Sequence, residues 1–248
     1  MKPFNFALCG TLLLMTAFTA RGAEGLESED ELYTGKEYST AFANPKDNPD
    51  LPNVLLIGDS ISIGYTTEVR KNLHGKADVF RIPSNAKNSA FGVKNLDKWL
   101  KAGKWDVIHF NWGLWDICYR DPKAKTQGHR DKINGKLTAT PEEYRKNMEA
   151  IVTRLLETDA TLIWCTTTPV PEKEAGRIEG DEVKYNEIAG EIMKQHDIAT
   201  DDLYAHAKPK LPEIQKGNDD VHFTEAGSAY LAEKVAQEIS QALPKSKP

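Results

Sequence analysis

Five short apolar segments alternate with longer stretches of helical pattern along most of this chain. The apolar segments span residues 53–57, 78–82, 106–111, 161–166 and 198–203, and the helical patterns span 63–73, 92–101, 141–158, 182–196 and 225–239. Short apolar strands joined by helices predict a parallel sheet that is covered on both faces. We therefore expect an α/β domain of three layers, α/β/α, with a flavodoxin-like, five-stranded parallel sheet in the strand order 2-1-3-4-5.

The length of 248 residues fits one such domain rather than two, and 40% hydrophobic residues are enough for a sizeable core. We place the domain at residues 53–242. A polar N-terminal extension, residues 23–52, precedes it, and a short tail, residues 243–248, follows it. The clearest helix start is at Thr140, where Pro141 and Glu143 complete a capping pattern.

The first 22 residues have the pattern of a secretory signal peptide. Lys2 is followed by a mostly apolar stretch over residues 6–20, and small residues suited to cleavage follow at Gly22 and Ala23. The stretch is too short for a membrane-spanning helix, and no later run is long and apolar enough to span a membrane. We therefore expect a secreted or periplasmic protein.

Charge and cysteine content narrow the function classes further. The formal charge of -5, without a basic stripe, argues against nucleic acid as the partner. Beyond the signal peptide only Cys118 and Cys165 remain, and they are either a disulfide or two buried thiols, of which we favour the thiols. No histidine and cysteine cluster has zinc spacing, so we expect neither a metal nor a cofactor.

Ser60 is the candidate nucleophile. It follows the first apolar segment directly and precedes a helix, where free backbone N–H groups and the helix dipole favour a developing anion. A serine at such a turn is also common as a plain helix cap. The carboxyl ends of parallel strands form the usual site edge of such sheets, and Ser60 lies at that edge.

His222 is the candidate general base. Asp219 precedes it by three residues, so that one loop presents both, and the aspartate would orient the imidazole and stabilise its charged form. Asp220 is the alternative partner. The competing interpretation is that these aspartates are solvated loop residues and that His222 is structural.

The motifs together resemble those of the SGNH (GDSL) hydrolase family. Its first block, Gly-Asp-Ser, is matched at residues 58–60, and its last block, Asp-x-x-His, at Asp219 to His222, over a similar region of about residues 53–242. The resemblance implies a serine hydrolase that acts on carboxylic ester bonds. It also implies that Asp59, Asn88 and Asp116 lie beside the substrate.

The two middle blocks differ from the family pattern. Lys87 or Asn88 stands where the family has the glycine whose N–H stabilises the oxyanion, and Trp115 replaces the asparagine of Gly-x-Asn-Asp. We expect the backbone N–H groups of Ser60 and Lys87 to act as oxyanion donors. The missing side-chain donor is expected from Trp115 or from Asn111, with Asn85 and Asn88 as alternatives.

These observations predict an exported serine esterase. The family resemblance implies that it removes acetyl or other short acyl groups, with carbohydrate as the expected alcohol. The substrate partner would be a small-molecule or glycan ester. The alternative is a carbohydrate-binding protein on the same fold, with catalysis weakened by the loss of the oxyanion asparagine. The sequence leaves the acyl group, the alcohol and the oligomeric state open.

Overall fold

A five-stranded parallel sheet forms the centre of the protein, in a computed structural model that describes residues 29–244. The strand order is β2-β1-β3-β6-β7, with β1 (Asn53–Ile57) between β2 (Asp78–Arg81) and β3 (Val107–Phe110), then β6 (Thr161–Cys165) and β7 (Ala199–Asp201). All neighbouring strands run parallel. In order of the core strands this is 2-1-3-4-5, so the predicted fold class and topology are confirmed.

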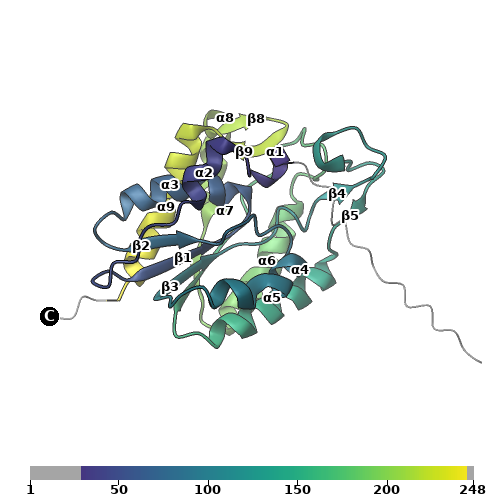
Figure 1. The fold of residues 1–248 in the computed structure, drawn as a ribbon. Helices are drawn as coiled ribbons and strands as arrows, with labels where there is room; N and C mark the ends of the chain where they lie inside the picture. The colour runs from purple at the N-terminus through teal and green to yellow at the C-terminus, as the bar shows by residue number, and fades with distance from the viewer. Residues whose placement is uncertain (1–28, 245–248) are drawn as a thin grey trace, which may run out of the picture.

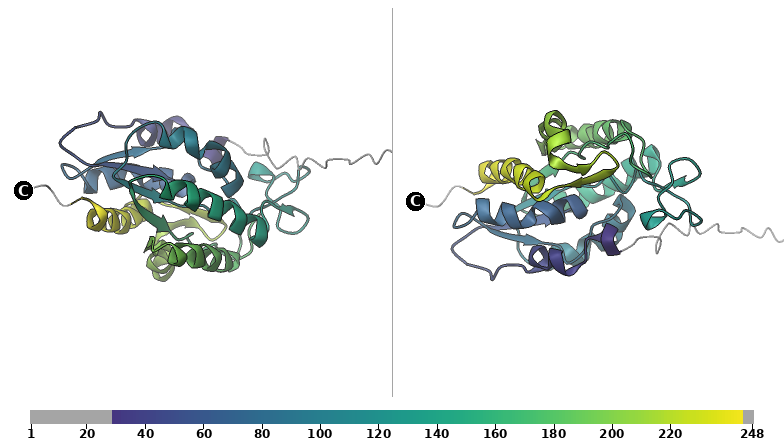
Figure 2. Two further views of the ribbon diagram at one scale, coloured as in Figure 1. Left: turned by 90° about the horizontal axis from the view of Figure 1, so that it is seen from below. Right: turned by 90° about the horizontal axis from the view of Figure 1, so that it is seen from above.

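Helices cover both faces of this sheet (Figure 1). One face carries α3 (Ser60–Asn72) and α9 (Glu225–Ala242), which pack on each other. The other carries α4 (Ser89–Leu100), α5 (Pro141–Leu156) and α6 (Asp181–Gln195), as the two views of Figure 2 show. The three layers bury β3 completely and all of β1 except its first residue, which explains why these strands read as apolar runs.

The predicted helix start at Thr140 is present in full. The Thr140 hydroxyl accepts the Glu143 N–H at 3.2 Å, and the Glu143 carboxylate accepts the Thr140 N–H at 2.8 Å. Pro141 occupies the first turn, where its missing N–H would have had no helical acceptor. Local side-chain chemistry therefore fixes where α5 begins.

Short elements outside the sheet surround the carboxyl ends of its strands. A segment that we call the N-terminal arm, residues 29–43, contains α1 (Glu29–Leu32), the 3₁₀ helix η1 (Lys36–Tyr38) and α2 (Ser39–Phe42). The loop after β3 carries the paired strands β4 (Tyr119–Arg120) and β5 (Lys136–Leu137) and a 3₁₀ turn, η2 (Gln127–His129). After β7 come α7 (Leu203–Ala207), η3 (Lys208–Lys210), α8 (Leu211–Ile214) and a hairpin of β8 (Gln215–Gly217) and β9 (Asp220–Phe223).

Both cysteines of the described chain are buried and carry free thiols. This agrees with the two-thiol interpretation of Cys118 and Cys165. The predicted signal peptide, residues 1–22, lies outside the described residues. Within residues 29–244, no helix has both the length and the apolar character needed to cross a membrane.

Helix α4 approaches the sheet closely through Gly92. A Cβ atom at Gly92 would lie 2.6 Å from ring carbons of Trp112, a residue that is 1% exposed, so the helix or the ring would have to shift. On α6, by contrast, a Cβ at Gly190 would lie 3.8 Å from the Trp164 ring, which is ordinary contact. Gly92 is therefore required by the close contact with Trp112, whereas the space around Gly190 would accept a larger residue.

We expect Gly92→Ala and Gly190→Ala to change stability in opposite directions. Gly92→Ala should lower the free energy of unfolding by about 1–3 kcal/mol, because overpacking outweighs the helix preference of alanine. Gly190→Ala should raise it by up to about 1 kcal/mol. Urea titrations of both variants beside the wild type test this, and a stabilised Gly92→Ala would contradict the close contact.

Candidate active site

The turn between β1 and α3 presents Ser60 at the carboxyl edge of the sheet. The Asp59 side chain caps α3 by accepting the Ile61 N–H at 3.0 Å. A Cβ on Gly58 would lie 2.8 Å from the Ser62 hydroxyl, so a larger residue would displace the turn. Among the described residues the Ser60 N–H has no acceptor. It is therefore a free helix N-terminal donor next to its own hydroxyl.

The β8–β9 hairpin brings His222 to this serine. The distance from Ser60 Oγ to His222 Nε2 is 2.8 Å, and both residues are almost enclosed, with exposed fractions of 4% and 9%. On the other ring nitrogen, His222 Nδ1 lies 2.5 Å from Asp220 Oδ1. Serine, histidine and aspartate thus form a continuous chain of hydrogen bonds with the geometry of a serine hydrolase triad.

The aspartate in this chain is Asp220 and not Asp219, the partner first expected. Asp220 and His222 are two residues apart on β9, so their side chains share one face, while Val221 and Phe223 point into the core. Asp219 lies in the turn before the strand and makes no hydrogen bond to His222 in the described chain. An expectation of a strand at residues 220–223, rather than a loop, would have favoured Asp220.

Asp220 is held in its ionised form. Its partial burial opposes ionisation, but the hydrogen bond and charge interaction with His222 outweigh burial and lower the pKa of Asp220 to about 2. A carboxylate that stays charged at neutral pH keeps the Nδ1 proton of the imidazole in place. Nε2 is then left as the acceptor for the serine proton.

The buried guanidinium of Arg81 fixes the loop that carries Ser60. Arg81 Nη2 donates to the carbonyls of Gly58 and Asp59 at 3.0 and 3.3 Å, and Nη1 donates to the Ser84 carbonyl at 2.9 Å. Burial lowers the pKa of Arg81 to about 9. This one side chain at the end of β2 therefore ties the β1–α3 turn to the β2–α4 loop.

The β2–α4 loop contains Lys87, one of the two predicted backbone oxyanion donors. Lys87 has a φ of +51°, the left-handed conformation that glycine adopts easily, which explains the family glycine at this position. Its N–H donates to Asn85 Oδ1 at 2.8 Å, so in this structure the donor is engaged. The Ala86 N–H donates to the Gly58 carbonyl at 3.1 Å, which holds the loop beside Ser60.

Two of the predicted side-chain oxyanion donors, Asn111 and Asn85, donate to other groups, and a third, Trp115, is buried. Asn111 donates to the Cys165 carbonyl at 2.8 Å and to the Thr167 hydroxyl at 3.3 Å, so its amide joins the ends of β3 and β6. Trp115 is 2% exposed and packs under the Arg120 guanidinium, 4.9 Å from the ring centroid. Asn85 uses one amide N–H on the Leu32 carbonyl at 3.3 Å.

Each of the three predicted substrate-binding residues has a structural partner. Asp59 caps α3, and Asn88 caps α4 by accepting the Phe91 N–H at 2.9 Å. Asp116 is fully buried and accepts the Ser89 hydroxyl at 2.6 Å. Asp116 therefore joins the β3–α5 loop to the start of α4.

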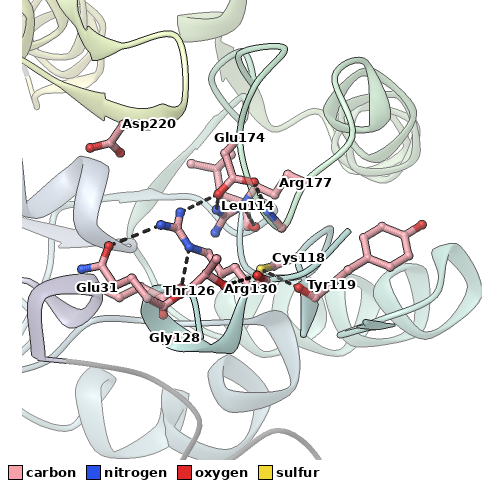
Figure 3. A network of polar contacts seen from close by, with 12 residues as sticks. Glu31, Leu114, Cys118, Tyr119, Thr126, Gly128, Arg130, Glu174, Arg177 and Asp220 are labelled. Atoms are coloured by element: carbon pink, nitrogen blue, oxygen red, sulfur yellow. Dashed lines mark hydrogen bonds and ion pairs between the residues drawn. The ribbon is translucent and has the colours of Figure 1, made fainter. Parts of the chain in front are cut away.

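A second polar network, which the sequence did not reveal, connects the β3–α5 loop to the β6–α6 loop (Figure 3). The fully buried Glu174 binds Arg130 at 2.5 Å and Arg177 at 3.0 Å, and Arg177 Nε donates to the Leu114 carbonyl at 2.6 Å. Residues from the β3–α5 and β6–α6 loops are thus held together by charge-assisted bonds. These partners are 44 and 63 residues apart along the chain, so no local pattern marks them.

One group in the described chain has donor atoms close enough to share a metal ion. It consists of His109, Cys165 and Asp201, with ligand atoms within 4.8 Å of one another. All three are buried in the core, and His109 Nε2 already bonds Asp201 Oδ2 at 3.0 Å. None of the three belongs to the Ser60, His222 and Asp220 chain.

Asp116 generates a prediction about pH and stability. Burial raises its pKa to about 7 in the folded protein, although the bonds from Ser89 oppose this. The unfolded chain releases the proton near pH 4, so the stability that Asp116 contributes is present below that pH and is lost as pH rises towards 7.

Asp116→Asn should therefore remove part of the pH dependence. Relative to the variant, the free energy of unfolding of the wild type should fall by up to about 4 kcal/mol between pH 4 and 7. Urea unfolding at several pH values measures this difference, with the exposed Asp50→Asn as the control. Parallel curves for wild type and Asp116→Asn would refute the raised pKa.

Comparison with solved structures supports the fold independently of sequence. A lipase/acylhydrolase from Enterococcus faecalis aligns with a TM-score of 0.64 and 19% identity, over 79% of this chain and 99% of the other. The acetyl xylan esterase AlAXEase aligns at 0.61 and 18% identity, over 75% and 99%. Axe2, an acetylxylan esterase from Geobacillus stearothermophilus, aligns at 0.59 and 17% identity, over 76% and 94%.

Comparison with curated proteins finds no match to the chain. The match to a protein family is extensive, however, because it covers residues 56–230, from β1 into α9. It includes both Ser60 and His222, whose side chains the fold brings within hydrogen-bond distance. The chain belongs to the GDSL-like lipase/acylhydrolase family and is a serine hydrolase that acts on ester bonds.

Proposed function

We propose that this protein is an exported serine esterase that removes acetyl or other short acyl groups from carbohydrate. The observation that carries the proposal is the hydrogen-bonded chain of Ser60, His222 and Asp220, with distances of 2.8 and 2.5 Å. A hydroxyl, an imidazole and a carboxylate in this order activate a serine for attack on a carbonyl.

In the proposed reaction the ester is cleaved in two steps. Ser60 Oγ attacks the ester carbonyl carbon while His222 Nε2 takes the hydroxyl proton, and the resulting oxyanion lies near the free Ser60 N–H at the start of α3. Collapse of the tetrahedral intermediate releases the alcohol, which receives the proton from His222, and leaves an acyl-serine. His222 then activates water, and hydrolysis releases the acid and restores Ser60.

Two features support a short acyl group on a sugar. Ser60 and His222 are almost enclosed, with exposed fractions of 4% and 9%, which favours a small acyl group over a long chain. A cavity of about 700 Å³ elsewhere in the protein, lined by Phe80, Trp99 and Trp105 among others, includes neither residue. Two of the similar structures are acetyl xylan esterases by name, and by analogy we infer an acetylated glycan as substrate.

We also propose that the protein acts outside the cytoplasm. The support is the sequence of residues 1–22, with Lys2, an apolar stretch and small residues at the expected cleavage position. The charge of -5 suits a neutral glycan or small-molecule ester better than a nucleic acid.

Ser60→Ala tests the proposed reaction directly. We expect the wild type to be labelled stoichiometrically by a fluorophosphonate and to release acetate from acetylated xylooligosaccharides faster than acid from octanoyl esters. Ser60→Ala should remain folded by circular dichroism and should not be labelled. Its ester hydrolysis should be slower by a factor of about a million. Glycan binding without labelling of the wild type would instead favour the weakened, carbohydrate-binding alternative.

The neighbouring aspartates provide a matched pair for the third triad position. Asp220→Asn should lower kcat by a factor on the order of 10⁴, because an amide favours the wrong imidazole tautomer. Asp219→Asn makes the same chemical change one residue earlier and should leave kcat within about twofold of the wild type. Steady-state kinetics on an aryl acetate distinguishes them, and equal losses in both variants would reject the assignment of Asp220.

A further inference from the structure

Three consecutive residues of the N-terminal arm contact three different loops around Ser60. Glu31 binds the Arg120 guanidinium with both carboxylate oxygens, at 2.5 and 3.0 Å, on the β3–α5 loop. The Leu32 carbonyl accepts from Asn85 of the β2–α4 loop at 3.3 Å. Tyr33 lies on His222 of the β8–β9 hairpin. The arm therefore binds to the site itself, although it precedes the region that matches the family.

The contact between Tyr33 and His222 is a ring stack. The ring centroids are 4.4 Å apart with an interplanar angle of 23°, and Tyr33 is 6% exposed. Tyr33 has a φ of +54°, an unfavourable conformation for a bulky residue that the surrounding contacts must hold in place. Glu31 provides one such anchor, since its carboxylate and Arg120 are both buried.

Further contacts fix the tyrosine ring on the hairpin. The Lys216 ammonium group, on β8, donates to the Tyr33 hydroxyl at 3.0 Å. Tyr38 of the same arm stacks on Tyr33 with a centroid distance of 4.0 Å. The ring that covers the imidazole is thus itself held by partners on the arm and on the hairpin.

The two hydrogen bonds of His222 only weakly restrain movement of its imidazole ring out of the ring plane. Both bonds, to Ser60 and to Asp220, act at the edge of the imidazole ring. Movement of the ring out of its plane tilts both bonds at once, and a flat neighbour against the ring face opposes that movement. Misplacement of a catalytic group by about 1 Å costs roughly a hundredfold in rate.

We propose that Tyr33 is a positioning residue of the active site, whose ring holds His222 in line with Ser60 Oγ and Asp220. The proposal rests on the proposed function, because it concerns the base of the same triad. It assigns the N-terminal arm to the catalytic site. A tyrosine that only covered the site would slow catalysis by blocking access. A tyrosine that positions His222 instead makes catalysis faster, so the two roles predict opposite effects of removing the ring.

The test compares Tyr33→Leu, which removes the flat ring, with Tyr33→Phe, which keeps the ring and removes only the hydroxyl. Tyr230→Leu is the control, because Tyr230 of α9 also stacks on a histidine, His206 of α7, with a centroid distance of 4.2 Å, and neither residue belongs to the triad. Two rates are measured for each folded variant, namely phosphonylation of Ser60 by a small fluorophosphonate and kcat and KM for an aryl acetate. Phosphonylation reports the reactivity of Ser60 and His222 without requiring the natural substrate.

We expect Tyr33→Leu to lower both the phosphonylation rate and kcat by about ten- to a hundredfold with KM little changed. Tyr33→Phe and Tyr230→Leu should stay within about threefold of the wild type. Unchanged or faster phosphonylation of Tyr33→Leu would overturn the proposal, as would equal losses in the Phe and Leu variants. Wild-type protein that is not labelled at Ser60 would instead refute the esterase, so the two failures are distinct.

Discussion

The hydrogen bond between Ser60 and His222 joins the end of the first sheet strand to a hairpin 162 residues later in the chain. It forms only if β1 lies between β2 and β3 and if α9, which directly follows the hairpin, packs against α3. Arg81 adds the other requirement, because its guanidinium holds the Ser60 turn against the adjacent loop. The alignment of two side chains therefore depends on the assembly of the whole sheet.

The elements of the sheet could be predicted because their signals are local. Buried parallel strands are apolar on both faces, and Thr140 with Glu143 marks the start of α5 by side-chain chemistry alone. Ser60 and His222 follow from motif and chain order in the same way. The β8–β9 hairpin has only a few residues per strand and a polar turn, so the sequence pattern indicates a loop there and favours Asp219 over Asp220.

The rest of the site could not be predicted because it depends on tertiary contacts. The amide of Asn111 is engaged by a carbonyl 54 residues away, and Glu31 meets Arg120 across 89 residues. No periodicity or motif records such pairs. The arm has a polar composition typical of a linker, and only the fold shows that its polar groups bind buried partners rather than solvent. The composition of the arm therefore does not indicate which residues it contacts in the folded protein.

The two buried thiols have a practical consequence. Burial raises the pKa of Cys118, and that of Cys165 even more strongly, so in the folded protein both remain protonated as well as shielded from solvent. The thiolate is the form that alkylating reagents attack, so neither side chain is reactive until the chain opens around it. Cys118 lies in the long loop after β3 and Cys165 at the end of a central strand. The rate at which Cys118 is alkylated therefore reports local opening of the loop. The rate at which Cys165 is alkylated reports global unfolding.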